Sequence, residues 1–151
     1  MKLAEALQER ADLKRKISDL RGRLDNVILV QEGEEPVEDP QQLIAELDGA
    51  VARLAYLMAA INHTNDQTVA GGQTLTQLIA RKDALALRMT AYKDLVNRAG
   101  QNTNRARGTE IRVKAVIGAA ALQKDVDRMA KEVRLLDNLL QQTNWTRDLI
   151  E

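Results

Sequence analysis

The sequence predicts a mainly all-α protein of four long antiparallel helices that form two duplicated helical hairpins. Apolar residues recur every three or four positions in four separate segments, the period of one face of a helix. Aromatic residues make up only 2% of the chain, whereas strands favour aromatic and β-branched side chains. Glycine and proline lie mostly between the periodic segments. At 151 residues, one helical domain spanning 1–151 is expected.

The first two helices are predicted from their apolar stripes and from one start signal. The first helix should span about 2–26, because its apolar residues share one face: Leu3, Leu7, Leu13, Ile17, Leu20 and Leu24. Asp39 can cap the second helix, and Pro40 suits its first turn. Its stripe then comprises Leu43, Leu47, Val51, Leu54, Leu57 and Ile61.

The third and fourth helices follow the same logic. Thr74 and Gln77 have the spacing of a capping box, which predicts a helix over about 75–97. The fourth stripe runs from Leu122 to Leu140, so this helix should end near Thr143.

Two connectors contain patterns typical of short strands. Residues 26–31 are rich in β-branched side chains, and residues 110–116 alternate between apolar and basic side chains over part of their length. We expect both segments to be extended. They could pair with each other if helices pack beneath them.

An internal pseudo-repeat of about 1–70 and 71–151 is predicted. An offset of 79 residues aligns Asp48 with Asp127, and the pair Thr64-Asn65 with Thr143-Asn144. Periodicity alone would align any two amphipathic helices, but it does not explain these shared polar residues. Duplication is therefore favoured over coincidence.

The repeated Thr-Asn pair has two interpretations. As a helix stop, it uses the tolerance of asparagine for left-handed backbone and the ability of threonine to bond back to the helix. If instead the second and fourth helices were parallel, both ends would lie at one pole and could bind a small polar ligand. The candidate ligand-binding residues are then Asn62, His63, Thr64, Asn65, Thr143, Asn144 and Trp145.

Composition restricts the chemistry and the compartment. The formal charge is zero, which argues against a dedicated nucleic-acid binder. No cysteine is present, the N-terminus lacks the apolar segment of a signal peptide, and the longest apolar run, 115–122, is too short to span a bilayer. We expect a cytoplasmic protein without membrane contact.

Charge is segregated along the chain. Residues 24–52 contain no lysine or arginine but many carboxylates, whereas residues 81–114 are rich in basic side chains. The two segments could face each other in an interface, with candidate residues Glu32, Glu34, Glu35, Arg105, Arg107 and Arg112. Two solvated charged surfaces are the alternative. Glu34, Glu35 and Glu38 could instead bind a divalent cation, but they lack EF-hand spacing, so no metal site is assigned.

No catalytic constellation is recognisable. His63 is the only histidine, and with alanine at position 60 it cannot supply the Glu-x-x-His pair of a di-metal helical bundle. We expect His63 to lie in the last turn of its helix, where it would assist the carbonyl end. The sequence thus leans toward a protein that is not an enzyme and has no cofactor.

Several segments together resemble one family. These are MKLAEAL at the start, VQEGEEPVEDP at 30–40, INHTN at 61–65, GGQTL at 71–75 and TNW at 143–145. They are similar to the septicolysin-like family of small bacterial all-helical proteins, some of which are carried on integron cassettes. The resemblance implies a compact helical fold that self-associates, and it implies no known activity and no catalytic residues.

The expected function is a non-enzymatic, homo-oligomeric helical protein that serves as a binding or adaptor module. The alternative is a protein, or an enzyme, that binds a small molecule, a nucleotide or a divalent ion. Its site would lie at the Thr-Asn helix ends or along the acidic connector within residues 24–52.

Overall fold

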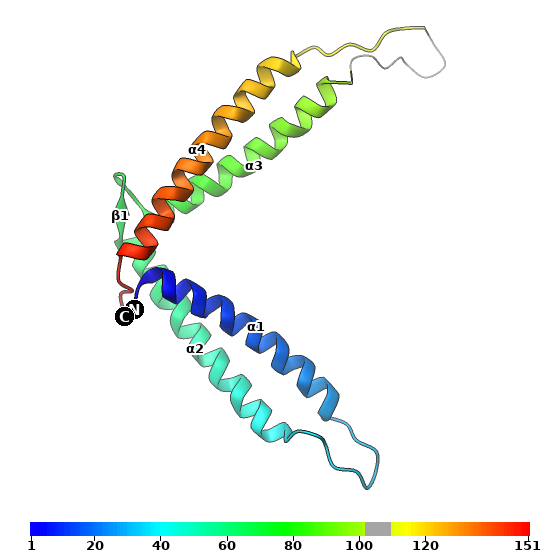
Figure 1. The fold of residues 1–151 in the computed structure, drawn as a ribbon, viewed down its shortest axis with the longest axis vertical. Helices are drawn as coiled ribbons and strands as arrows, with labels where there is room; N and C mark the ends of the chain where they lie inside the picture. Colours follow the sequence, from blue (N-terminus) through cyan, green and yellow to red (C-terminus); the bar gives the residue numbers. More distant parts are fainter. Residues whose placement is uncertain (102–109) are drawn as a thin grey trace. The chain divides into compact units, whose positions relative to one another are not determined.

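The computed structural model describes residues 1–101 and 110–151, which form four long helices and one small sheet (Figure 1). The elements in chain order are α1 (Leu3–Val27), α2 (Pro40–Gln67), β1 (Val69–Ala70), β2 (Gln73–Thr74), α3 (Leu75–Ala99) and α4 (Ala119–Thr146). The predicted mainly all-α fold is confirmed, and each of the four helices contains the apolar stripe from which it was predicted. None of the helices in the described residues is long and apolar enough to cross a bilayer.

The described chain divides into two compact units. The first unit contains Met1–Thr68 together with Thr143–Glu151, and the second contains Val69–Gln142. The first boundary lies close to that of the predicted pseudo-repeat, but the last nine residues belong to the first unit. The single domain and the duplication stay predictions.

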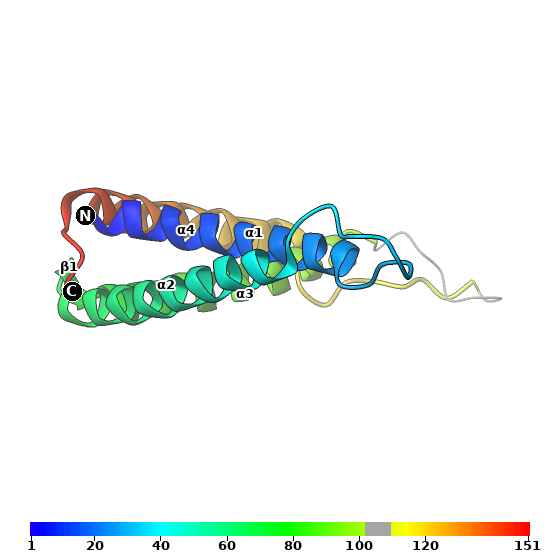
Figure 2. The ribbon, with the colours of Figure 1, turned by 90° about the horizontal axis from the view of Figure 1, so that it is seen from below.

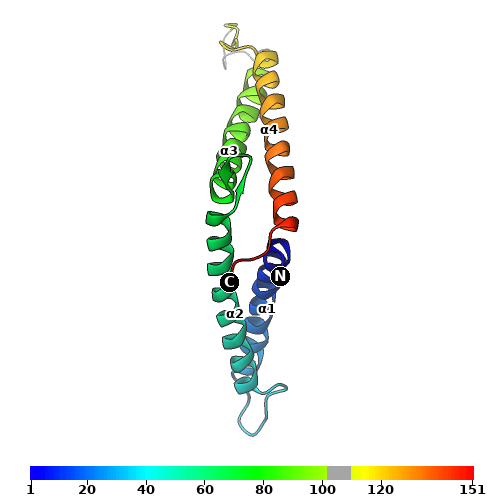
Figure 3. The same cartoon turned by 90° about the vertical axis from the view of Figure 1, so that its left-hand side faces the viewer.

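The first unit is a hairpin of α1 and α2, which lie side by side (Figures 1 and 3). Its core contains Leu3, Leu20, Leu57 and Ile61, all of which are almost fully buried. Figure 2 shows that the acidic connector, residues 28–39, extends beyond the adjoining ends of both helices. Near this end Val27 and Leu43 are buried together with Leu20.

The second unit contains the β1–β2 hairpin, α3 and most of α4. The stripe of α4 that was predicted from the sequence is buried, and it comprises Leu122, Val126, Met129, Leu136 and Leu140. Two ion pairs join α3 to α4: Arg81 Nη2 lies 2.5 Å from Glu132 Oε1, and Lys82 Nζ lies 3.0 Å from Asp137 Oδ1. The stripe and the ion pairs hold these two helices side by side.

Both predicted helix starts are confirmed in atomic detail. The side chain of Asp39 accepts a hydrogen bond from the backbone N–H of Gln41 at 2.9 Å, and Pro40 is the first residue of α2. Thr74 and Gln77 form the reciprocal capping box, at 3.0 and 3.2 Å. Each contact satisfies a backbone donor that has no partner within the helix.

The two predicted strands are corrected. Asn26 and Val27 complete α1, and residues 28–31 have no regular structure. Residues 110–116 are irregular apart from one bridging residue, Arg112. In the described part of the chain the sheet is formed by β1 and β2, which pair Val69 with Thr74 and Ala70 with Gln73. Ile28, Leu29 and Val30 are largely exposed, so among the described residues their side chains have no second strand or core to pack against.

The Thr-Asn pairs are not helix stops, and this prediction is wrong. Thr64 and Asn65 lie within α2, which continues to Gln67, and Thr143 and Asn144 lie within α4, which continues to Thr146. Among the described residues, only glycines have positive φ, so no asparagine ends a helix in left-handed backbone. The expected bond of Thr64 back to its own helix is confirmed, since its hydroxyl donates to the carbonyl of Ala60 at 2.8 Å.

A substitution pair tests the turn between β1 and β2. Gly72 has φ +81°, whereas Gly49 lies inside α2 with open space where a Cβ would be. We expect Gly72→Ala to lower the free energy of unfolding by about 1–2 kcal/mol, because left-handed backbone is costly for alanine. Gly49→Ala should raise it by about 0.5–1 kcal/mol, because alanine has the higher helix propensity. Chemical denaturation measures both, and equal signs would contradict the assignment of this turn.

Candidate functional site at the paired helix ends

Both Thr-Asn pairs belong to the first unit. Thr64 and Thr143 are buried, at 0% and 7% exposure, whereas Asn65 and Asn144 are half-buried. The outermost members are Asn62, His63 and Trp145, and Trp145 is 52% exposed. The buried members therefore face the protein interior, and the histidine and the indole face outward.

The C-terminal segment that follows Trp145 is fastened to the N-terminus. The backbone N–H of Leu3 donates to the carbonyl of Arg147, and that of Leu149 donates to the carbonyl of Met1, both at 2.9 Å. Lys2 pairs with Asp148 in an antiparallel bridge, with Nζ 2.7 Å from Oδ1. We call residues 147–151 the C-terminal strap. Within this strap the side chain of Leu149 is buried.

Thr64 connects this strap to α2. Its hydroxyl donates to Ala60, as described above, and accepts a hydrogen bond from the backbone N–H of Ile150 at 2.9 Å. A hydroxyl can donate one bond and still accept others, so one buried threonine serves both partners. The first Thr-Asn pair thus binds the chain that follows the second pair.

The remaining candidates are not brought together. Among the described residues, no hydrogen bond joins Asn62, His63 or Asn65 to Asn144 or Trp145. On the second pair, the carbonyl of Thr143 accepts bonds from the N–H of Arg147 and the hydroxyl of Thr146. At the helix ends the structure shows contacts that hold the two termini together. The predicted polar ligand site stays a prediction.

An ion pair that the sequence did not predict lies between α1 and α2. The guanidinium of Arg53 binds the carboxylate of Glu9 through two hydrogen bonds of 2.7 and 3.0 Å. The same guanidinium lies 5.2 Å from the centroid of the Tyr56 ring. Hydrogen bonding to Arg53 holds the pKa of Glu9 below its ordinary value, and Lys2 does the same for the pKa of Asp148.

These depressed pKa values predict how stability depends on pH. A carboxylate with a lower pKa in the folded state stabilises the protein above its unfolded pKa, and this contribution is lost as pH falls through the folded pKa. In the unfolded chain Glu9 has the ordinary pKa of a glutamate side chain, about 4.3. We therefore expect wild type to be more stable than Glu9→Gln at neutral pH and the difference to shrink as pH falls below this value. Thermal melts of both proteins across this range measure it, and a difference that grows in acid would contradict it.

The acidic connector is anchored to α1. Glu38 binds the guanidinium of Arg23 through both carboxylate oxygens, one of them 3.1 Å from Nε, and this bonding lowers the pKa of Glu38. Within the described residues, no three histidine or carboxylate side chains gather in a way that would hold a metal ion. Of the candidate metal ligands, Glu34 and Glu35 point to solvent, and Glu38 is occupied by Arg23.

The candidate interface residues are described only in part. Glu32, Glu34, Glu35 and Arg112 are exposed. Arg105 and Arg107 lie outside the described residues. The predicted charge complementarity between these segments stays a prediction.

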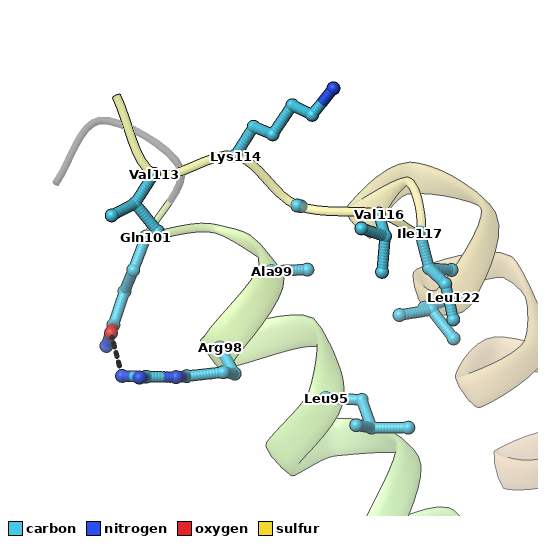
Figure 4. Close-up of a pocket in the computed structure, with 10 residues that line it drawn as sticks. Leu95, Arg98, Ala99, Gln101, Val113, Lys114, Val116, Ile117 and Leu122 are labelled. Atoms are coloured by element: carbon cyan, nitrogen blue, oxygen red, sulfur yellow. Dashed lines mark hydrogen bonds between the residues drawn. The ribbon is translucent and has the colours of Figure 1, made fainter. Parts of the chain in front are cut away.

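Two apolar features of the structure were not predicted from the sequence. The first is a row on α2 formed by Ile44, Val51 and Met58, which we call the outer row. Val51 was predicted to lie in the buried stripe, but it is 47% exposed and Ala50 is buried beside it. The second is a cavity of about 460 Å³ in the second unit, between the end of α3 and the chain that leads into α4 (Figure 4). The sequence contained a signal for both features. The outer row has an interval of seven residues in α2, and the connector at the cavity contains the apolar side chains Val113, Val116 and Ile117.

Comparisons with known proteins place the chain in a family. The model of a family of unknown function, DUF6847, matches residues 10–149. One similar solved structure is the crystal structure of a functionally unknown conserved protein from Corynebacterium diphtheriae. It has 36% sequence identity and a TM-score of 0.91, with 99% of each chain covered. No match was found among curated proteins. The resemblance to the septicolysin-like family is not tested by these matches.

Proposed function

We propose that the chain, which belongs to the DUF6847 family, is a non-enzymatic helical binding or adaptor module that works as a homo-oligomer assembled through α2. The observation that supports this is the outer row. Ile44, Val51 and Met58 are 36%, 47% and 44% exposed, although they are large and apolar.

The outer row is additional to the residues that α2 needs for its own hairpin. Two rows of α2 already face inward, each with a seven-residue interval: Leu43, Ala50, Leu57 and Thr64 are buried, and Leu47, Leu54 and Ile61 are buried or half-buried. Two such rows are enough for a seam between two helices. A third apolar row is typical of a helix that packs against more than one neighbour.

A second copy of this chain is the neighbour that we propose. The outer row continues over two seven-residue intervals of a helix of 28 residues, which is about 42 Å long. A two-fold axis through the row would bring the same residues of both copies together, the commonest arrangement of homo-oligomers. Burial of apolar surface then stabilises the dimer.

Light scattering over a range of protein concentrations tests the assembly. We expect a mass above that of one chain that persists as the salt concentration rises, because apolar contacts are not screened. If Glu32, Glu34, Glu35 and Arg112 held the copies together instead, salt would dissociate them. A monomer at every concentration would contradict the proposal.

The absence of cysteine allows a direct test of the contact. Val51→Cys introduces the only thiol of the chain at the centre of the outer row. We expect oxidation to link two copies through this position. Ala52→Cys, one residue later and also exposed, is the matched control that should cross-link poorly.

A further inference from the structure

The cavity of the second unit is a separate feature with its own chemistry. Its walls are aliphatic: Leu95 and Ala99 come from α3, Val116 and Ile117 from the connector, and Leu122 from α4 (Figure 4). A volume of about 460 Å³ lies in the range of small-molecule sites, which is about 300–1,000 Å³. The site can therefore accept a small apolar group.

Among the described residues that line this cavity, the charged side chains are basic, and Gln101 adds a neutral amide. Arg98 and Lys114 belong to the lining, and none of the ten lining residues is acidic. Arg98 Nη1 donates to Gln101 Oε1 at 3.0 Å at the end of α3, and Lys114 extends outward from the connector (Figure 4). Both side chains are exposed and point away from the aliphatic residues, so an anion that binds to them remains in contact with water (Figure 4).

The absence of rings from the lining restricts the apolar part of the ligand. The ten lining residues include no aromatic side chain, so a nucleotide base would find no ring on which to stack. Aliphatic walls suit a hydrocarbon chain instead.

We propose that this cavity binds a straight-chain carboxylate of fatty-acid type, with the hydrocarbon chain against Leu95, Val116 and Ile117 and the carboxylate at Arg98 and Lys114. The site lies within the second unit and does not depend on the association through α2. Charge complementarity and the aliphatic lining are the grounds for this ligand class.

The test is an NMR titration of the full chain with decanoate, kept below its micelle concentration. We expect the amide signals of Gly100 and Gly118, which flank the lining residues in sequence, to shift, and that of Gly49 in α2 to stay in place. Octanoate should bind about tenfold more weakly, because each buried methylene contributes about 0.8 kcal/mol. Decanol, which lacks the charge, should bind several-fold more weakly than decanoate.

Two pairs of variants separate this site from nonspecific binding. Val116→Asp places a carboxylate at a side chain that is 92% exposed, so folding should be unaffected, and it should weaken decanoate binding at least about tenfold. Leu87→Asp, also on an exposed side chain of the second unit but outside the lining, should have no effect. Arg98→Gln with Lys114→Gln should weaken binding about three- to tenfold, whereas Lys93→Gln should not.

Three results would overturn the proposal. Gly100 and Gly118 signals that do not move with decanoate would exclude the site. Equal affinities for octanoate and decanoate would show that the chain is not enclosed. Binding to vesicles of anionic phospholipid without any response to decanoate would assign the basic and apolar side chains to a membrane surface instead.

Discussion

Replacing Val51 and Met58 together by glutamate is expected to dissociate the proposed dimer and to raise its Kd at least about 100-fold. A carboxylate that is buried in an apolar contact without a partner costs several kcal/mol, and about 2.7 kcal/mol corresponds to 100-fold in affinity. In a two-fold contact each substitution acts twice. Light scattering as a function of concentration measures the change in mass.

The matched control is Ala52→Glu with Ala59→Glu. These positions have the same seven-residue interval and add the same charge, but they lie one residue further along α2, on exposed alanines outside the outer row. The control should remain dimeric. Because all four side chains are exposed in the hairpin, circular dichroism should show unchanged helix content in both variants. If the control dissociates as readily as the outer-row variant, net charge and not the outer row explains the effect.

The helices could be predicted because their signals are local. A stripe of apolar side chains every three or four residues fixes the helical period, and the caps at Asp39 and Thr74 fix two starts within a residue. These signals do not depend on which elements of the fold pack against each other. The helix lengths, 25 residues for α1 and α3 and 28 for α2 and α4, are also what a duplication would produce.

Strands and helix ends were harder because tertiary context decides them. Residues 26–31 have β-branched side chains, yet in the part of the chain that the structure describes no partner strand lies beside them. The strands that do form flank Gly71 and Gly72, whose positive φ values of 55° and 81° suit a two-residue hairpin turn. The Gly-Gly dipeptide was therefore a stronger signal of paired strands than the β-branched side chains of residues 26–31. Thr64 was predicted to end its helix because of its local preference for a helix end. In the structure its burial within α2 outweighs this preference.

The candidate site depends on contacts between remote segments. Glu9 and Arg53 are 44 residues apart, and Thr64 and Ile150 are 86 apart, so only the packing of α1, α2 and the C-terminal strap brings them together. The outer row is different. Its interval of seven residues in Ile44, Val51 and Met58 was visible in the sequence, but Val51 was assigned to the buried stripe.

Thr64→Val is expected to lower the free energy of unfolding by about 1–2 kcal/mol. Valine keeps the shape of the side chain, but it removes the hydroxyl that accepts the N–H of Ile150. A buried donor that loses its partner costs about 1–3 kcal/mol, and the hydrogen bond from Ile150 to Thr64 is only partly buried. Thr90→Val is the matched control, because the Thr90 hydroxyl donates to the carbonyl of Ala86 at 3.1 Å but has no bond to the strap. It should change stability by less than about 0.5 kcal/mol.

Deleting residues 147–151 completes a double-mutant cycle with Thr64→Val. The deletion removes the bonds of the strap to Met1, Leu3 and Thr64 together with the buried Leu149, so we expect it to destabilise the chain more than Thr64→Val does. In the shortened chain Thr64→Val should have almost no further effect, because the bond that it would break is already gone. Hydrogen exchange at the Ile150 amide of the full-length variant gives a second measurement that does not depend on the shortened chain folding. If Thr64→Val costs the same in both chains and leaves this exchange unchanged, Thr64 acts only within α2 and does not fasten the strap.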